Sequence, residues 1–280
     1  MFCRPIKIFL AVVLFFPALG VAEDEASSAL NHPLVLQAKA ANPERYEFAV
    51  QHGANILATP DRRSFYLLWF PEENPAQMSL PILVTLHGHA SWAFDEFYLW
   101  HPYAKKRGFG ILALQWWFGT GDGAQDYYSP QAMYPVIEKI LWQNGMSPGV
   151  ALLHGFSRGA ANAYALAALD HKSGNDFFGL VIANAGGAAS DFPPNAEISA
   201  GRFGPQPFSG TQWVLYCGLQ DENPERDGCP AMRRTRGWIE QFGGTVALLI
   251  EDPGQGHGGF HHNPSAVDKA LDLFQKKVTS

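Results

Sequence analysis

The chain has 280 residues, of which 47% are hydrophobic and only 16% are charged, and its formal net charge is −6. This composition is too apolar and too weakly charged for an intrinsically disordered chain. A multi-span membrane protein is also excluded, because the sequence has no repeated apolar runs of roughly 20 residues. The mild acidity provides no general electrostatic attraction to nucleic acid or to an anionic membrane. We therefore expect a globular protein with no nucleic-acid partner, and the composition does not indicate an oligomeric state.

Residues 1–22 have the pattern of a secretory signal peptide. Arg4 and Lys7 precede an apolar run at 8–16, and small residues lead to Ala22. This order predicts cleavage after Ala22 and a secreted or periplasmic protein. An uncleaved membrane anchor is the alternative, but the apolar run is too short to cross a bilayer, so no stable anchor is expected.

The predicted cleavage leaves two cysteines, Cys217 and Cys229, because Cys3 lies in the signal peptide. An even pair in an oxidising compartment predicts one disulfide bond. Two unconnected buried thiols are the alternative. The short loop that this bond would close contains several acidic residues, among them candidates for a catalytic acid.

Residues 23–280 are predicted to form one domain that begins with an irregular segment. Tyr46–His52 and Phe65–Phe70 are predicted as strands that pair at an antiparallel edge. From Leu80 onward, short apolar runs alternate with helical patterns, which is typical of a mostly parallel sheet with helices on both faces. The expected parallel strands are Ile82–Leu86, Gly110–Leu114, Val150–His154, Leu180–Ala183, Trp213–Cys217 and Val246–Ile250. The expected helices are Trp92–Lys106, Pro130–Gln143, Arg158–Leu169, Ala231–Phe242 and Pro264–Lys277.

The interval 186–210 interrupts this alternation, since it contains four prolines and several glycines. A long connection without secondary structure inside a compact domain is often an active-site cover. We therefore treat 186–210 as a candidate cover loop, with an ordinary surface excursion as the alternative.

The strongest chemical signal is the motif Gly-Phe-Ser-Arg-Gly at 155–159, which follows a predicted strand and begins a predicted helix. A sharp strand-to-helix turn strains its central residue, and flanking glycines remove the side chains that would collide there. Ser157 is thereby exposed near the positive end of the helix dipole. We predict Ser157 to be a nucleophile, and a solvated serine in a Gly-Ser turn is the alternative.

A nucleophilic serine needs a base, and His257 occupies the expected place. It lies in a glycine-rich loop between the last predicted strand and the C-terminal helix, where the loop can bring the imidazole over the carboxyl edge of the sheet. His261 and His262 are nearby alternatives, but they begin the following helix.

The base needs an acid that orients it, and the order serine, acid, histidine is expected for this architecture. Asp221 directly follows the penultimate predicted strand, so it lies at the same edge of the sheet as the serine. Glu222 is its nearest competitor, followed by Asp227 and Asp191.

The oxyanion of an acyl-transfer intermediate needs fixed hydrogen-bond donors. The backbone N–H of Arg158 is one candidate, and those of the turn around Gly88 and His89 are the other. A metal site at His87 and His89 is the rival interpretation, but the sequence has no further ligands at suitable spacing. We therefore predict no metal and no cofactor.

These features together resemble the serine-hydrolase branch of the α/β-hydrolase superfamily, over essentially the chain from Leu80 onward. The resemblance implies an α/β-hydrolase fold with Ser157 as nucleophile, His257 as general base and acid, and Asp221 as its orienter. It also implies an oxyanion hole at the amides of His89 and Arg158. Among subgroups, the chain looks most like secreted esterases, feruloyl esterases and polyhydroxyalkanoate depolymerases, with peptidases close behind.

The sequence departs from the simple family pattern at 115–118 and at 186–210, so the resemblance does not identify the substrate. Four aromatic residues in or beside the expected carboxyl-end loops are candidates for a substrate pocket, although core packing is the alternative for each. They are Trp92, Trp116, Trp117 and Phe156.

The predicted function is a secreted serine hydrolase that cleaves a carboxylic ester through an acyl-enzyme intermediate. The expected substrate is a small-molecule or polymer-derived ester. Peptide cleavage by the same three residues is one alternative. A secreted binding protein that kept the fold and lost turnover is the other.

Overall fold

The computed structural model describes residues 29–71 and 80–279, so the predicted signal peptide at 1–22 lies outside the described residues. Its strands are β1 (Asn55–Ala58), β2 (Phe65–Trp69), β3 (Ile82–Leu86), β4 (Gly110–Leu114), β5 (Ala151–Phe156), β6 (Phe178–Asn184), β7 (Gln212–Gly218) and β8 (Thr245–Asp252). Its α-helices are α2 (Pro33–Ala41), α3 (Pro43–Gln51), α4 (Ala93–Arg107), α5 (Pro130–Gln143), α6 (Arg158–Ser173), α7 (Pro193–Ser199), α8 (Cys229–Gln241) and α9 (Pro264–Thr279). Two 3₁₀ turns, η2 (Ala124–Asp126) and η3 (Phe260–His262), are also described.

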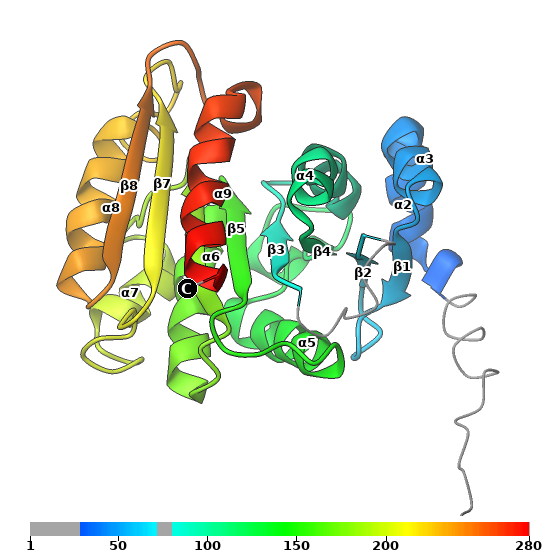
Figure 1. The fold of residues 1–280 in the computed structure, drawn as a ribbon, viewed down its shortest axis with the longest axis horizontal. Helices are drawn as coiled ribbons and strands as arrows, with labels where there is room; N and C mark the ends of the chain where they lie inside the picture. The colour runs from blue at the N-terminus through cyan, green and yellow to red at the C-terminus, as the bar shows by residue number, and fades with distance from the viewer. Residues whose placement is uncertain (1–28, 72–79, 280) are drawn as a thin grey trace, which may run out of the picture.

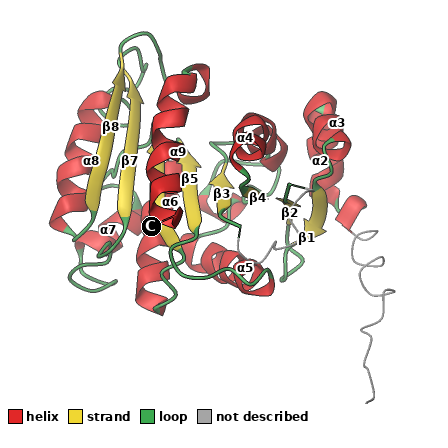
Figure 2. Cartoon of the chain, in the orientation of Figure 1, coloured by secondary structure: helices red, strands yellow, loops and turns green. Residues whose placement is uncertain are grey.

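The strands form one eight-stranded sheet in the order β1-β2-β4-β3-β5-β6-β7-β8 (Figure 1). The pairs β1–β2 and β2–β4 are antiparallel, and every other neighbouring pair is parallel. Figure 2 shows β5, β7 and β8 as arrows that point the same way. The prediction of a mostly parallel sheet is therefore confirmed, and the carboxyl ends of its parallel strands meet at one edge.

Helices cover both faces of the sheet and bury an apolar core on each (Figure 1). On one face, Ile137 of α5, Ala163 of α6 and Ile239 of α8 belong to one core cluster. On the other, Phe97 of α4 and Leu271 of α9 belong to the second. Because both faces are covered, the central strands are almost continuously buried and mainly apolar, as the sequence pattern predicted. No helix in the described ranges is both long and apolar enough to cross a membrane.

The predicted strand at Tyr46–His52 is wrong, because this segment lies in helix α3 and the segment before it forms helix α2. The side chain of Asn42 caps α3 by accepting a hydrogen bond from the backbone N–H of Arg45 at 3.2 Å, and Pro43 occupies the first turn. An Asn cap followed by proline is a helix-start signal that outweighs the aromatic content of the segment. The antiparallel edge does exist, but β1 forms it with β2.

The interval 186–210 is not structureless, because it contains the short helix α7. Pro193 and Pro194 lie in its first turn, where proline loses no helical hydrogen bond. Ile198 is fully buried and belongs to the same core cluster as α5 and α6, so the interval is anchored to the body of the fold.

Candidate active site

Ser157 lies in a strained turn between β5 and α6. Its backbone φ is 54° and ψ is −117°, a positive φ that non-glycine residues rarely adopt. A Cβ at Gly155 would lie 2.4 Å from the carbonyl oxygen of Gly159, and a Cβ at Gly159 would lie 2.6 Å from that of Leu86. The motif glycines are therefore required by the close packing of strand, turn and helix. The backbone N–H of Ser157 donates to the carbonyl of Asn184 at 2.8 Å, which ties the turn to β6.

One chain of hydrogen bonds joins three side chains that are far apart in the sequence. The Oγ of Ser157 lies 2.8 Å from Nε2 of His257, and Nδ1 of the same imidazole lies 2.8 Å from Oδ2 of Asp221. The Asp221 side chain is almost fully buried, whereas that of His257 is 35% exposed. The second carboxylate oxygen of Asp221 accepts the backbone N–H of Asn223 at 2.8 Å. A buried, oriented carboxylate behind an accessible imidazole is suited to stabilise an imidazolium ion.

The loops that carry Asp221 and His257 are held against each other by backbone contacts. The N–H of Gln220 donates to the carbonyl of Gln255 at 3.0 Å. A Cβ at Gly218 would lie 2.2 Å from that same carbonyl oxygen, so only glycine allows this approach. The sulfur atoms of Cys217 and Cys229 lie at disulfide-bonding distance, and the twelve-residue separation between them spans the acidic loop.

Asp227, one of the predicted alternatives for the acid, lies close to the same imidazole. Burial raises the pKa of its carboxyl group, the charge of His257 opposes this effect, and the Asp221 carboxylate adds to it. No hydrogen bond joins Asp227 to His257 among the described residues, whereas Asp221 has a direct one. Glu222 is exposed, and Asp191 pairs with Arg226 at 3.5 Å. Asp221 is therefore the acid that contacts the imidazole.

A cavity of about 420 Å³ lies over Ser157, and its walls include His89, Arg158, Phe192 and Asp227. In the part of the chain that the structure describes, the backbone N–H groups of His89 and Arg158 donate no hydrogen bond. The N–H of Arg158 belongs to the first turn of α6, where intrahelical acceptors are absent. Both residues therefore line the cavity with a backbone N–H that no acceptor among the described residues uses.

The side chain of Arg158 extends along the wall of this cavity. Its guanidinium lies 3.9 Å from the centre of the Tyr127 ring, and its Nη1 donates to the carbonyl of Asp122 at 3.0 Å and lies 3.2 Å from Nδ1 of His89. Oη of Tyr127 lies 2.9 Å from that same imidazole nitrogen. These contacts fix the Arg158 side chain although no carboxylate among the described residues pairs with it.

His87, the other histidine of the rival metal interpretation, is fully buried and bonded at both ring nitrogens. Nδ1 lies 2.8 Å from the carbonyl of Gly88, and Nε2 accepts the backbone N–H of Trp116 at 3.3 Å. Burial lowers the pKa of His87 to about 4, so the ring is neutral at pH 7. Its contacts give His87 a structural role in the turn that presents His89.

The four aromatic residues predicted to form a pocket have different surroundings. Trp116 lines a second cavity beside the one over Ser157. Phe156 packs beside His257, with 5.1 Å between ring centres. Trp92 and Trp117 pack against each other at 5.1 Å and contribute to the core that includes α4. Sequence reasoning did not identify Phe192 or Asn162, which also line the second cavity, because the topology alone brings α7 beside α6.

No protein-family model and no curated protein matches the sequence. Several solved structures superpose over most of its length. The hyperthermophilic esterase from Pyrobaculum calidifontis is 15% identical, and the match covers 93% of this chain and 92% of that one at a TM-score of 0.59. A fungal esterase from Rhizomucor miehei is 12% identical, and the match covers 92% of this chain and 96% of that one at a TM-score of 0.60. Thermogutta terrifontis esterase 2 is 14% identical, and the match covers 80% of this chain and 93% of that one at a TM-score of 0.55.

The chain has the α/β-hydrolase fold. Its parallel core agrees with the alternation of strands and helices expected from the sequence, and the Ser157 turn follows β5 as the motif predicted. These neighbours are less than 25% identical, so the likeness concerns the fold.

Behind the serine turn, the α/β-hydrolase fold of this chain contains a buried polar network. Glu96 of α4 is 3% exposed and accepts the hydroxyl of Thr85 at 2.6 Å, while His154 of β5 lies 3.3 Å from the same carboxylate oxygen. Nε2 of His154 lies 3.4 Å from the side-chain nitrogen of Asn184, whose backbone carbonyl holds the N–H of Ser157. Burial opposes ionisation of Glu96, but its contacts with His154 and Thr85 outweigh it and lower its pKa.

Replacing Glu96 with glutamine should lower the free energy of unfolding at pH 7 by about 2 kcal/mol, because the charged acceptor of the buried Thr85 hydrogen bond becomes a neutral one. The lowered pKa means that the carboxylate stabilises the fold fully above pH 4.5 and loses this effect as the pH falls toward its folded-state pKa. Urea unfolding of both proteins at several pH values measures the difference. Glu240→Gln, which breaks the exposed pair with Arg236, is the control and should cost less than about 1 kcal/mol. Equal losses for the two variants would contradict the role of the buried network.

Proposed function

We propose that this protein is a serine hydrolase that cleaves carboxylic esters in two acyl-transfer steps. The observation that supports this proposal most strongly is the hydrogen-bonded series Ser157, His257 and Asp221. The distances from Oγ of the serine to Nε2 of the imidazole and from Nδ1 to Oδ2 of the aspartate are both 2.8 Å. The esterases that share the fold agree with this chemistry.

In the first step, Oγ of Ser157 attacks the ester carbonyl carbon while Nε2 of His257 takes the hydroxyl proton. The tetrahedral intermediate collapses as His257 returns that proton to the leaving alcohol oxygen. Water then attacks the acyl-enzyme by the reverse sequence, and the carboxylic acid and free Ser157 result. Asp221 holds the imidazole in the tautomer that this proton transfer requires and stabilises the imidazolium.

The negative oxygen of each intermediate needs preorganised donors. We assign this role to the backbone N–H groups of His89 and Arg158. Both residues border the cavity over Ser157, and neither amide is used elsewhere among the described residues. Because these donors are main-chain groups, side-chain substitutions at either position would leave them in place.

Labelling with a fluorophosphonate probe tests the proposed nucleophile. The probe should attach to Ser157, and p-nitrophenyl acetate should be hydrolysed at a rate that chelators do not change. Peptide amides measured alongside distinguish ester from peptide cleavage. A protein that hydrolyses the ester without labelling, and that loses activity to chelators, would contradict the proposal.

We further propose that the protein is exported and that Cys217 and Cys229 form a disulfide. The basic, apolar and small-residue order of residues 1–22 and the distance between the two sulfur atoms support both statements. The bond would restrain the loop that carries Asp221.

Reducing the disulfide should lower the free energy of unfolding by about 2–4 kcal/mol, because a closed loop restricts the unfolded chain. Activity should fall as well, since the Asp221 loop gains freedom. Thermal unfolding and ester hydrolysis with and without dithiothreitol measure both effects. The Cys217→Ala, Cys229→Ala double variant is the control, and it should not respond to the reductant. Wild-type stability and activity that the reductant does not change would contradict the proposed disulfide.

A further inference from the structure

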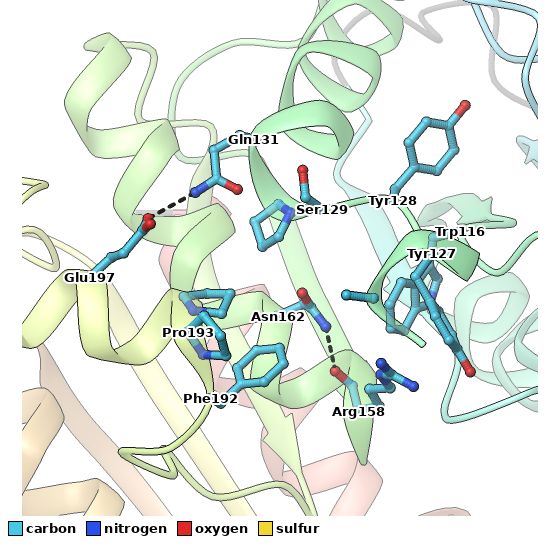
Figure 3. Close-up of a pocket in the computed structure, with 13 residues that line it drawn as sticks. Trp116, Tyr127, Tyr128, Ser129, Gln131, Arg158, Asn162, Phe192, Pro193 and Glu197 are labelled. Carbon is cyan, nitrogen blue, oxygen red and sulfur yellow. Dashed lines mark hydrogen bonds between the residues drawn. The ribbon is translucent and has the colours of Figure 1, made fainter. Parts of the chain in front are cut away.

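A second cavity of about 210 Å³ adjoins the cavity over Ser157 (Figure 3). The start of α5, the first turns of α6, the start of α7 and the loop that contains η2 surround it. Arg158 and Phe192 line both cavities, so the two cavities are neighbours that meet at these residues. The second cavity therefore lies within reach of a group bound to the serine.

The walls of this second cavity are mainly flat and apolar. Trp116, Tyr127, Phe192 and Pro193 contribute rings to them (Figure 3). A cavity of roughly 150 Å³ with apolar walls holds one benzene molecule, so 210 Å³ accommodates one aromatic ring and a short linker. Rings on the walls can stack on a planar group or meet it edge-on, an interaction that a flexible alkyl chain does not make.

Several polar side chains line the cavity: Gln131 and Glu197 bond each other at 3.0 Å, Ser129 accepts the backbone N–H of Ala132, and the nearly buried one is Asn162. This residue is only 3% exposed, and its Nδ2 donates to the backbone carbonyl of Arg158 at 2.8 Å. Its Oδ1 has no hydrogen-bond partner among the described residues, and Figure 3 shows this oxygen pointing away from Arg158 toward the start of α5. An acceptor that faces a cavity without a protein partner favours a ligand that brings a donor.

The position of His257 determines which part of an ester this cavity can hold. The leaving alcohol must lie beside Nε2 of His257, which returns a proton to it. His257 is not among the residues that line the second cavity, which meets the cavity over Ser157 at Arg158 and Phe192. The acyl part remains on the serine and is therefore the part that extends past Arg158.

We propose that the second cavity is the acyl subsite, that it takes a single planar ring, and that Asn162 selects a ring bearing a hydrogen-bond donor. This inference rests on the proposed ester hydrolysis. Arg158, whose guanidinium lies on the Tyr127 ring and donates to the carbonyl of Asp122, lines both cavities together with Phe192. An acyl group would therefore pass from one cavity to the other at these two residues.

Four p-nitrophenyl esters with the same leaving group test the subsite: the acetate, the octanoate, the 3-phenylpropanoate and the 3-(4-hydroxyphenyl)propanoate. The two ring esters should exceed the octanoate in kcat/KM, and the hydroxylated ring should be the better of the two. Phe192→Ala should lower the ratio of ring ester to acetate about tenfold. Asn162→Leu should remove most of the preference for the hydroxyl, about five- to tenfold. Lys139→Ala, on the exposed side of α5, is the control that should change neither ratio.

Direct binding separates failure of the subsite from failure of the proposed function. Calorimetry with Ser157→Ala and the non-hydrolysable N-methyl-3-(4-hydroxyphenyl)propanamide should detect binding that Phe192→Ala, added to the same variant, weakens. If the wild type hydrolyses none of the esters but this binding is present, the subsite stands and the ester-hydrolase proposal fails. Octanoate hydrolysis equal to that of the ring esters, with ratios unchanged by Phe192→Ala and Asn162→Leu, overturns the subsite, as does absence of amide binding.

Discussion

Replacing Ser157 with alanine should lower kcat for p-nitrophenyl acetate by a factor on the order of 10⁶. The substitution removes the hydroxyl oxygen that we propose forms the acyl-enzyme, while the proposed backbone donors stay in place. Alanine retains the Cβ of serine, so the strained turn with φ of 54° can be kept. Steady-state hydrolysis gives the effect, and circular dichroism with urea unfolding shows whether the fold is unchanged.

Ser209→Ala is the matched control, because this exposed serine lies far along the chain from the turn and lines neither of the two cavities described. It should retain the activity of the wild type. Ester hydrolysis by Ser157→Ala at a rate near that of the wild type, with the fold intact, would remove Ser157 from the role of nucleophile.

Replacing Asp221 with asparagine should lower kcat by about 10⁴-fold with little change in KM. The asparagine amide can donate to Nδ1 of His257, which favours the tautomer with its proton on Nε2 and so prevents that nitrogen from accepting the serine proton. The burial of Asp221 makes this effect large, because water cannot replace the missing carboxylate. The pH profile of kcat/KM provides a second measurement, since the imidazolium loses its stabilising charge.

Asp227→Asn distinguishes the two acids of this loop. Asp227 lies near His257 without a hydrogen bond to it, so this variant should lose less than about tenfold in kcat. If Asp227→Asn were the more damaging substitution, Asp227 would be the acid that orients the base, and the arrangement of the loop in solution would differ from the one described.

The local signals in the sequence were sufficient for most of the architecture. Short apolar runs bounded by glycine and proline identified the parallel strands from Ile82 onward, because strands buried on both faces must be continuously apolar. Helix α5 was predicted with the bounds Pro130–Gln143 that the structure shows. Helices α3 and α7 were not predicted. For α3 the aromatic content of the segment led to a strand prediction despite the Asn42 cap, and for α7 the prolines at its start were interpreted as part of a loop.

The site also has parts that the sequence predicts and parts that it does not. Gly155 and Gly159 predict a sharp turn at Ser157, because the packing there leaves no room for a side chain at either position. Asp221 and His257 each follow a predicted strand, which places both residues at one edge of the sheet. The sequence by itself thus determined the fold class and the candidate residues. Only the tertiary structure decided that Asp221 rather than Asp227 contacts His257. It also placed Phe192 and Asn162 in one cavity, since these contacts depend on how helices pack across the sheet and no local pattern records such distances.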